Sequence, residues 1–207
     1  MTLFIHIPKN AGSSIQKASG IRSQMHKPLR WVDWVNGDAV ITSIRNPYDR
    51  IVSVYYYLHK AQDKIKNFKC RARRQSHKIS HFNGVNEWIS HFHKNQDEYR
   101  GKASDSNDVK FFLWQMESFF HQQINYLNEA DGEPVSDRIT DILRYETLED
   151  DWAAYALLHD LPPLQHKNKS ELRPSTPWQE ELSAESIAKI GELYADDFEH
   201  LNYERIN

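Results

Sequence analysis

Short apolar runs alternate with amphipathic stretches along the first part of this 207-residue chain. Residues 3–7 and 39–44 are mostly apolar, which is typical of strands that are buried on both faces. Pro8 ends the first run and Gly12 loosens the chain after it, and Pro47 comes shortly after the second run. The pattern therefore predicts two successive strand–loop–helix units.

The residues at the ends of these two helices indicate where each begins and ends. We expect Ser13 or Ser14 to cap the first helix and Gly20 to end it, so this helix is short. In the second unit, Asn46 can cap the helix and Pro47 suits its first position. The second helix has an apolar face made of Ile51, Val52, Tyr55 and Leu58.

The middle of the chain has helical periodicity. Apolar residues recur at helical spacing from about residue 83, and again over a longer stretch from about 108 to 127. Residues 161–178 contain four prolines, which predicts a long loop. A last helix is expected from about Ser183.

A further strand is predicted for residues 139–145, which are largely apolar. Thr147 and Asp150 have the spacing of a capping box, and they predict a helix that runs to about residue 159. Strands that alternate with helices favour a mostly parallel sheet covered on both faces. We therefore predict an α/β fold in which a mostly parallel sheet is flanked by helices.

The chain has the size of one domain. Its 207 residues are in the usual range for a single core, so we predict one domain over residues 1–207. With 39% hydrophobic and 12% aromatic residues, the chain can bury enough apolar surface to fold. A single cysteine, Cys70, excludes a disulfide scaffold and is compatible with a reducing compartment.

Targeting and membrane segments are not evident in the sequence. The first residues lack the basic region and long apolar stretch of a signal peptide, and no apolar run reaches about eighteen residues. We therefore expect a cytoplasmic protein with no membrane partner, although a truncated luminal enzyme would share these features. Nothing in the pattern predicts the oligomeric state.

Charge is segregated along the chain, although the net charge is only −3. Residues 60–78 carry eight Lys and Arg against the single acid Asp63, whereas 129–151 and 180–199 are acidic. The basic stretch could hold an anionic partner, or it could be a solvated linker. Aromatic residues hardly interleave with its charges, so we expect no nucleic-acid partner.

The loop after the first strand has the composition of an anion site. Small residues from 10 to 14 let backbone N–H groups approach an anion, and the helix that follows adds donors and partial positive charge. Lys9 adds a full charge. The Gly-Lys-Ser/Thr order of a Walker A loop is missing, which argues against ordinary ATP or GTP chemistry. The alternative is a plain strand-to-helix turn.

A second anion site is predicted after the second strand. Arg45 ends that strand and Ser53 lies two helical turns beyond Pro47, so both can reach one anion. The alternative is a capped helix on whose surface Arg45 and Arg50 pair with Asp49.

Together these two segments resemble the sulfotransferase superfamily that uses 3′-phosphoadenosine 5′-phosphosulfate (PAPS). Residues 4–15 resemble its 5′-phosphosulfate loop, and residues 44–55 resemble its 3′-phosphate motif. Further similar segments are residues 142–148, 168–170 and 194–203. The nearest branch is the carbohydrate type, which includes glycan 2-O-sulfotransferases.

The resemblance implies roles for individual residues. Lys9 and the amides of the loop would hold the 5′-phosphosulfate; the loop residues are Asn10, Ala11, Gly12, Ser13 and Ser14. Arg45 and Ser53 would hold the 3′-phosphate, and Lys169 with Ser170 would belong to a late cofactor loop. The product would be 3′-phosphoadenosine 5′-phosphate (PAP). The family needs no divalent metal, so none is expected.

Sulfuryl transfer to a hydroxyl by in-line attack needs charge stabilisation and a base. Lys9 can stabilise the leaving phosphate oxygen. His26 resembles the catalytic His of glycan 2-O-sulfotransferases and is our candidate base, with Glu146 as the rival. We interpret His6 as a hydrogen-bonded core residue. The spacings of His91 with His93, and of His77 with His81, could suit a metal but lack further ligands.

We therefore predict a PAPS-dependent sulfotransferase that acts on a hydroxyl of an acceptor. We expect this acceptor to be a saccharide or acidic glycan rather than a small phenol. Two alternatives stay open. One is a nucleotide-dependent phosphotransferase with an atypical phosphate loop, and the other is a catalytically silent polyanion-binding protein.

Overall fold

The computed structural model describes residues 2–23, 26–32, 39–64, 79, 81–100, 118–129, 133–165 and 173–206. The chain divides into two compact units, and each has a hydrophobic core of its own. The first unit comprises residues 1–46 and 122–169, and the second comprises residues 47–121 and 170–207. The single domain over residues 1–207 stays a prediction.

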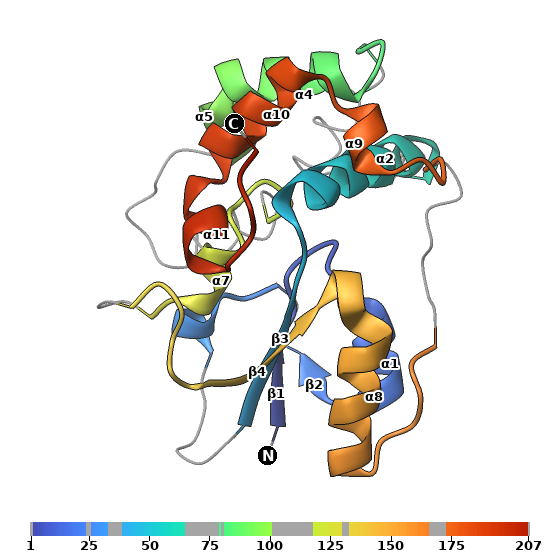
Figure 1. Ribbon diagram of the computed structural model, residues 1–207, viewed down its shortest axis with the longest axis vertical. Coiled ribbons are helices and arrows are strands. Elements are labelled where there is room, and N and C mark those ends of the chain that lie inside the picture. Colours follow the sequence, from blue (N-terminus) through green and yellow to red (C-terminus); the bar gives the residue numbers. More distant parts are fainter. Residues whose placement is uncertain are drawn as a thin grey trace. The chain divides into compact units, whose positions relative to one another are not determined.

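The first unit is built on a parallel sheet (Figure 1). Its described strands are β1 (Thr2–Ile5), β2 (Arg22–Ser23), β3 (Ala39–Ile44) and β4 (Ile139–Arg144), in the order β2-β1-β3-β4. Every neighbouring pair is parallel. The predicted α/β fold is thereby confirmed, and β3 has the predicted bounds.

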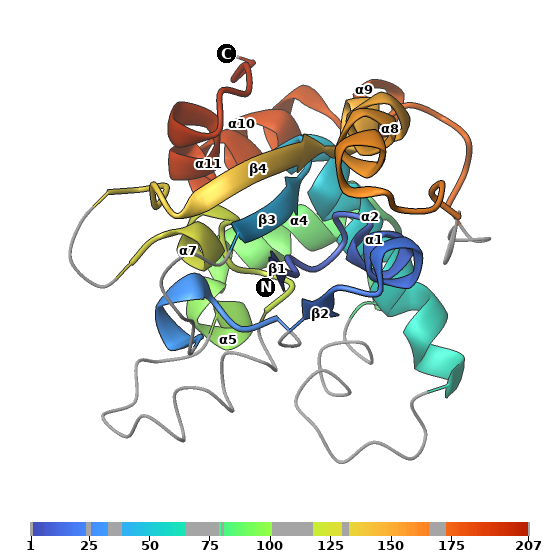
Figure 2. The same cartoon turned by 90° about the horizontal axis from the view of Figure 1, so that it is seen from below.

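Helices cover the sheet of the first unit on both sides. Figures 1 and 2 show α1 (Gly12–Ser19) and α8 (Leu148–His159) on one side, where they bury a shared apolar core. That core includes Phe4, Ile15, Ile41, Leu143 and Trp152. The short α7 (Ile124–Leu127) lies on the other side, and Arg30 of the 3-10 helix η1 (Leu29–Trp31) donates to the carbonyl oxygen of Asn125 at 2.7 Å.

The second unit is helical in its described part. Its helices are α2 (Pro47–Lys64), α4 (Val85–Lys94), α5 (Gln96–Arg100), α9 (Trp178–Glu181), α10 (Ala184–Leu193) and α11 (Ala195–His200). Its core is rich in aromatic side chains, of which Tyr48, Trp88, Phe92, Tyr99 and Phe120 are at most 1% exposed. No described helix is long and apolar enough to cross a membrane.

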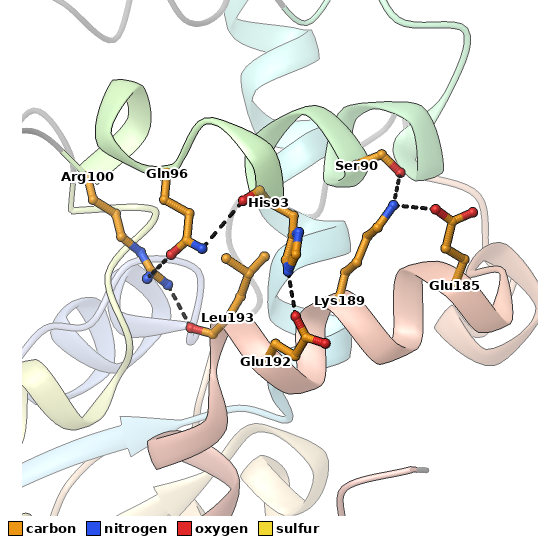
Figure 3. A network of polar contacts seen from close by, with 8 residues as sticks. All are labelled: Ser90, His93, Gln96, Arg100, Glu185, Lys189, Glu192 and Leu193. Atoms are coloured by element: carbon orange, nitrogen blue, oxygen red, sulfur yellow. Dashed lines mark hydrogen bonds and ion pairs between the residues drawn. The ribbon is translucent and has the colours of Figure 1, made fainter.

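A row of polar contacts joins α4 and α10 (Figure 3). Lys189 donates to the hydroxyl of Ser90 at 2.8 Å and pairs with Glu185 on its own helix. One turn further along, the Nε2 atom of His93 lies 2.6 Å from a carboxylate oxygen of Glu192. At the end of α10, Arg100 donates to the carbonyl of Leu193 at 2.7 Å. The contacts of Lys189 and His93 thus join α4 to α10, and that of Arg100 joins α5 to α10.

The predicted helix over 108–127 is wrong within residues 118–123, and its residues 108–117 lie outside the described part. The backbone carbonyls that a helix would need are bound elsewhere. Buried Arg50 donates to the carbonyls of His121 and Phe119, at 2.9 and 3.4 Å, and Arg100 donates to that of Phe120 at 3.2 Å. Only α7 keeps the predicted helical form.

Helix ends agree with the predictions in part. Gly20 ends α1 in the left-handed conformation, α2 begins at Pro47, and Ser183 caps α10 through its side chain. Neither Ser13 nor Ser14 caps α1, since the N-cap residue is Ala11 and its carbonyl accepts from the helix. The predicted last helix is interrupted, because α10 ends at Leu193 and α11 begins at Ala195.

The capping box predicted at the start of α8 is also wrong. Thr147 occupies the N-cap position but makes no capping hydrogen bond through its side chain. Its backbone belongs to the 3-10 helix η3 (Tyr145–Thr147), so it enters α8 from a turn rather than from an extended segment. An N-cap side chain normally reaches the first-turn N–H groups from an extended backbone, which explains the missing bond.

The two N-caps predict a contrast in stability. The side chain of Ser183 accepts from the N–H of Ser186 at 3.2 Å, so Ser183→Ala should lower the free energy of unfolding by about 1 kcal/mol. Thr147→Ala is the matched control and should change it by less than about 0.5 kcal/mol. Urea unfolding of both variants measures the difference, and equal losses would contradict the assignment of the Ser183 cap.

Candidate functional site

The loop between β1 and α1 has a strained backbone. Lys9 and Ala11 have φ angles of 71° and 62°, in the left-handed region that residues other than glycine seldom occupy. The carbonyl of Ala11 accepts from the N–H groups of Ser14 and Ile15, at 2.8 and 3.3 Å. The two N–H groups before these, of Gly12 and Ser13 at the start of α1, have no carbonyl of their own helix to accept from them, so an anion can bind them.

Gly12 lets this loop pack closely against His6. A Cβ atom at position 12 would lie 2.1 Å from Cδ2 of the His6 ring, which is far inside contact distance. Glycine is therefore required here by the close approach of the imidazole. His6 itself follows β1 instead of lying within it, and it is only partly buried.

Reciprocal hydrogen bonds join the loop to the end of β3. The side-chain amide of Asn10 donates to the carbonyl of Ser43 at 2.8 Å, and the Ser43 hydroxyl donates to the carbonyl of Asn10 at 2.6 Å. Both residues are fully buried. Hydrogen bonds in a buried setting are costly to break, so this pair fixes the loop on the strand that leads to Arg45.

Gln123 completes this buried cluster, and sequence reasoning missed it. Its Oε1 atom accepts from the Asn10 side chain at 2.6 Å and from the Arg45 N–H at 2.9 Å. Its Nε2 atom donates to the Arg45 carbonyl at 2.8 Å. No motif includes Gln123, and the pattern around it predicts a helix. The sequence therefore gave no indication that Gln123 belongs to this cluster.

The guanidinium of Arg45 is held in one orientation. It donates to the carbonyl of Lys9 at 2.9 Å, and its central carbon lies 3.7 Å above the centre of the Tyr145 ring. Arg45 is 4% exposed and Arg50 is 1% exposed, so the alternative interpretation of both as surface residues is wrong. Asp49 pairs with Arg173.

Glu146 bridges the ends of two strands. Its Oε1 atom accepts from the backbone N–H of Asn46 at 2.6 Å, so it links the turn after β4 to the residue that follows Arg45. This contact is a structural one. A catalytic role for Glu146 stays a prediction.

A contact with a backbone carbonyl determines the tautomer of His26. Its Nδ1 atom lies 2.9 Å from the carbonyl oxygen of His6, which can only accept, so Nδ1 carries the hydrogen. Nε2 is then the basic nitrogen of the neutral ring. The rings of His6 and His26 lie 4.4 Å apart between centroids, and His26 has a left-handed φ of 65°.

His6 stays neutral beside this ring. Burial first, and then the charge of His26, lowers the pKa of His6 from 6.5 to about 3, against the opposing effect of a hydrogen bond with Gln16. At neutral pH, His6 therefore places no positive charge next to His26. The expectation of a hydrogen-bonded His6 agrees with the Gln16 contact.

The other predicted site residues lie elsewhere or outside the described residues. Ser53 lies in the second unit on α2, where it is 7% exposed. Outside the described part lie Lys169, Ser170 and residues 65–78 of the basic stretch, which include His77. Among the described residues, no group of three or more His, Cys, Asp or Glu side chains could hold a metal ion.

In the first unit, the site occupies the carboxyl ends of the parallel strands, where such sheets bind ligands (Figure 1). The loop after β1 brings Lys9 and the start of α1, and the end of β3 brings Arg45. Two cationic side chains and a helix N-terminus favour an anion such as a phosphate or sulfate group. The structure therefore joins the Lys9 loop and Arg45 in one hydrogen-bonded cluster, to which Ser53 does not belong.

The neutral His6 predicts a specific loss of stability in acid. Because its folded pKa lies below the unfolded value, unfolding takes up a proton, and the stability present above pH 6.5 is lost as the pH falls towards 3. Between about pH 7.5 and about pH 5, His6 should account for about 2 kcal/mol of this loss.

The measurement is the free energy of unfolding in urea at both pH values, for the wild type and for His6→Gln. The variant should lose less stability than the wild type over this interval, because glutamine does not titrate. An equal loss in both proteins would show that His6 titrates normally.

The amino-acid sequence of the chain matches a known protein family. A model described as the Sulfotransferase family matches residues 2–204, which is nearly the whole chain. No curated protein and no solved structure matches the chain. The matched region includes the loop after β1, the end of β3 and the turn after β4. The chain therefore belongs to the sulfotransferase family, whose members transfer a sulfuryl group to a hydroxyl acceptor.

Proposed function

We propose that this sulfotransferase takes its sulfuryl group from PAPS and transfers it to a hydroxyl of a saccharide. The observation that carries this proposal is the 2.9 Å hydrogen bond from the Arg45 guanidinium to the Lys9 carbonyl. It joins the Lys9 loop to Arg45, and both belong to the first unit. A donor with phosphate groups at both ends of one nucleoside fits two such neighbouring segments better than a donor with a single phosphate chain.

The described residues supply the donors that PAPS needs. Lys9 and the N–H groups from Asn10 to Ser13 would bind the 5′-phosphosulfate, whereas the Ser14 N–H is already bound to the Ala11 carbonyl. Arg45 would bind the 3′-phosphate. Charged and N–H donors of this kind suit phosphate and sulfate oxygens. The role of Ser53 rests on its spacing from Arg45 and on the family resemblance, and the roles of Lys169 and Ser170 rest on the resemblance alone.

The chemical step is an in-line displacement at sulfur. The acceptor oxygen forms a bond to sulfur while the bond from sulfur to the phosphate oxygen breaks, and PAP leaves. Nε2 of His26 takes the proton of the acceptor hydroxyl. The Lys9 ammonium stabilises the negative charge that develops on the leaving phosphate oxygen.

His26 is better suited than Glu146 to act as the general base. The carbonyl of His6 holds Nδ1–H of His26, so Nε2 has the lone pair that a base needs. This arrangement repeats the logic of catalytic triads, in which a partner fixes the tautomer and orientation of the imidazole. The carboxylate of Glu146 is already bound to the Asn46 N–H.

The proposed acceptor is a hydroxyl of a saccharide. It rests on the resemblance to glycan 2-O-sulfotransferases and on the basic composition of residues 60–78, which would attract an acidic glycan. A cytoplasmic location also stays a prediction from the sequence. Labelled transfer to a panel of glycans and small alcohols would identify the acceptor class.

Nucleotide selectivity tests the donor. PAP should raise the thermal unfolding midpoint more than ATP with magnesium does, because the site binds a 3′-phosphate. Arg45→Ala should raise the Kd for PAP by roughly tenfold or more, since charged hydrogen bonds to the phosphate are lost. Arg138→Ala, which removes a partly exposed guanidinium paired with Glu129 in the same unit, is the matched control and should bind PAP normally.

Preference for ATP with magnesium would favour the phosphotransferase alternative. An Arg45→Ala protein that binds PAP as tightly as Arg138→Ala would remove Arg45 from the site. Binding of PAP without transfer to any member of the acceptor panel would favour the polyanion-binding alternative.

Turnover tests the base. His26→Ala should lower the rate of sulfuryl transfer from radiolabelled PAPS by about a hundredfold or more, because general bases contribute that much. Its Kd for PAP should stay within about twofold of wild type, because the base contacts the acceptor rather than the nucleotide. His159→Ala, at an exposed position on α8, is the control. A normal rate for His26→Ala would move the base to another residue, with Glu146 first.

A further inference from the structure

Gln123 lies outside both predicted anion-binding segments, yet its side chain contacts residues of each. It precedes α7 directly and is fully buried. Its amide makes three hydrogen bonds, two accepted by Oε1 and one donated by Nε2. The partners are the side chain of Asn10 and the backbone of Arg45, so one side chain connects the two segments.

The contacts with Arg45 reproduce those of a neighbouring strand. Oε1 accepts from the Arg45 N–H at 2.9 Å, and Nε2 donates to the Arg45 carbonyl at 2.8 Å. Two residues of a β-ladder exchange hydrogen bonds with one another in the same manner. Because β3 ends at Ile44, the amide of Gln123 holds the backbone one residue beyond the strand. The Arg45 side chain therefore starts from a fixed backbone position.

The contact with Asn10 fixes the other segment. The Nδ2 atom of Asn10 donates to Oε1 of Gln123 at 2.6 Å and to the Ser43 carbonyl at 2.8 Å. This orientation leaves Oδ1 of Asn10 buried without a hydrogen-bond partner. An unpaired buried acceptor costs free energy, and the two hydrogen bonds that Nδ2 donates offset this cost. The orientation of Asn10 thus depends on Gln123.

Only glutamine supplies this combination of groups. A glutamate at position 123 would keep the acceptor but place a second oxygen against the Arg45 carbonyl. A methionine would fill a similar volume and leave the buried N–H and carbonyl of Arg45, and Nδ2 of Asn10, with one partner fewer.

We propose that Gln123 is a positioning residue, which sets the Lys9 loop and Arg45 at the spacing that a nucleotide with phosphates at both ends requires. This inference rests on the proposed function, because it assumes that both segments bind the same nucleotide. A preformed spacing lowers the ordering cost of binding a two-ended ligand, and a ligand that engages one segment gains less from it.

The test compares PAP with adenosine 5′-phosphate, which lacks the 3′-phosphate. Gln123→Met should raise the Kd for PAP by about tenfold or more and that for adenosine 5′-phosphate by less than about threefold. Trp152→Phe is the matched control, since it also removes one buried hydrogen bond in the first unit, from the indole N–H to the Pro162 carbonyl. It should lower the thermal midpoint without changing the ratio of the two affinities.

Hydrogen exchange tests the contact itself without any ligand. The Arg45 amide should exchange faster in Gln123→Met than in wild type or Trp152→Phe, because its acceptor is removed. Unchanged exchange at Arg45, or an unchanged ratio of the two affinities in Gln123→Met, overturns the inference. The proposed function still stands in that case if the wild type binds PAP. A wild type that does not bind PAP overturns both.

Gln123→Glu keeps the test possible if the methionine variant does not fold. At about pH 8 the carboxylate repels the Arg45 carbonyl, so the Kd for PAP should rise relative to wild type. At about pH 5.5 a buried, protonated carboxyl can donate to that carbonyl, since burial raises its pKa, and the difference from wild type should shrink. A glutamate variant that equals the wild type at both pH values overturns the inference.

Discussion

Two reciprocal hydrogen bonds between Asn10 and Ser43 hold the loop after β1 against the end of β3, and the rest of the site depends on them. They are fully buried, so water cannot replace them at low cost. Through them the strained backbone of Lys9 and Ala11 is kept in place, and the Lys9 carbonyl meets the Arg45 guanidinium. Hydrogen bonds between side chains and backbone carbonyls thus fix the spacing of the Lys9 loop and Arg45.

The parts of the fold that the sequence predicts are those set by local chemistry. An apolar run between Asp38 and Arg45 has few alternatives to a buried strand, and Pro47 can begin a helix but not continue one. Gly20 and Ser183 act at helix ends for equally local reasons. The two candidate anion-binding segments were identified in the same way, from residue types that suit phosphate and sulfate groups, and their binding role stays a prediction.

Tertiary contacts decide the parts that the sequence did not predict. Residues 118–121 have helical periodicity, but Arg50 and Arg100 bind the carbonyls that a helix would use. β2 consists of Arg22 and Ser23, which carry no strand signal of their own and pair because β1 lies beside them. Gln123 acquires its role only because the fold brings it next to Asn10 and Arg45, which lie far from it in sequence.

The central claim is that PAP bridges the Lys9 loop and Arg45. A crystal structure of the complex with PAP tests it most directly. Our account predicts the 5′-phosphate against the backbone N–H groups at the start of α1 and the 3′-phosphate within hydrogen-bonding distance of the Arg45 guanidinium. A 3′-phosphate that lies away from Arg45, or a 5′-phosphate that makes no contact with the loop after β1, would contradict it.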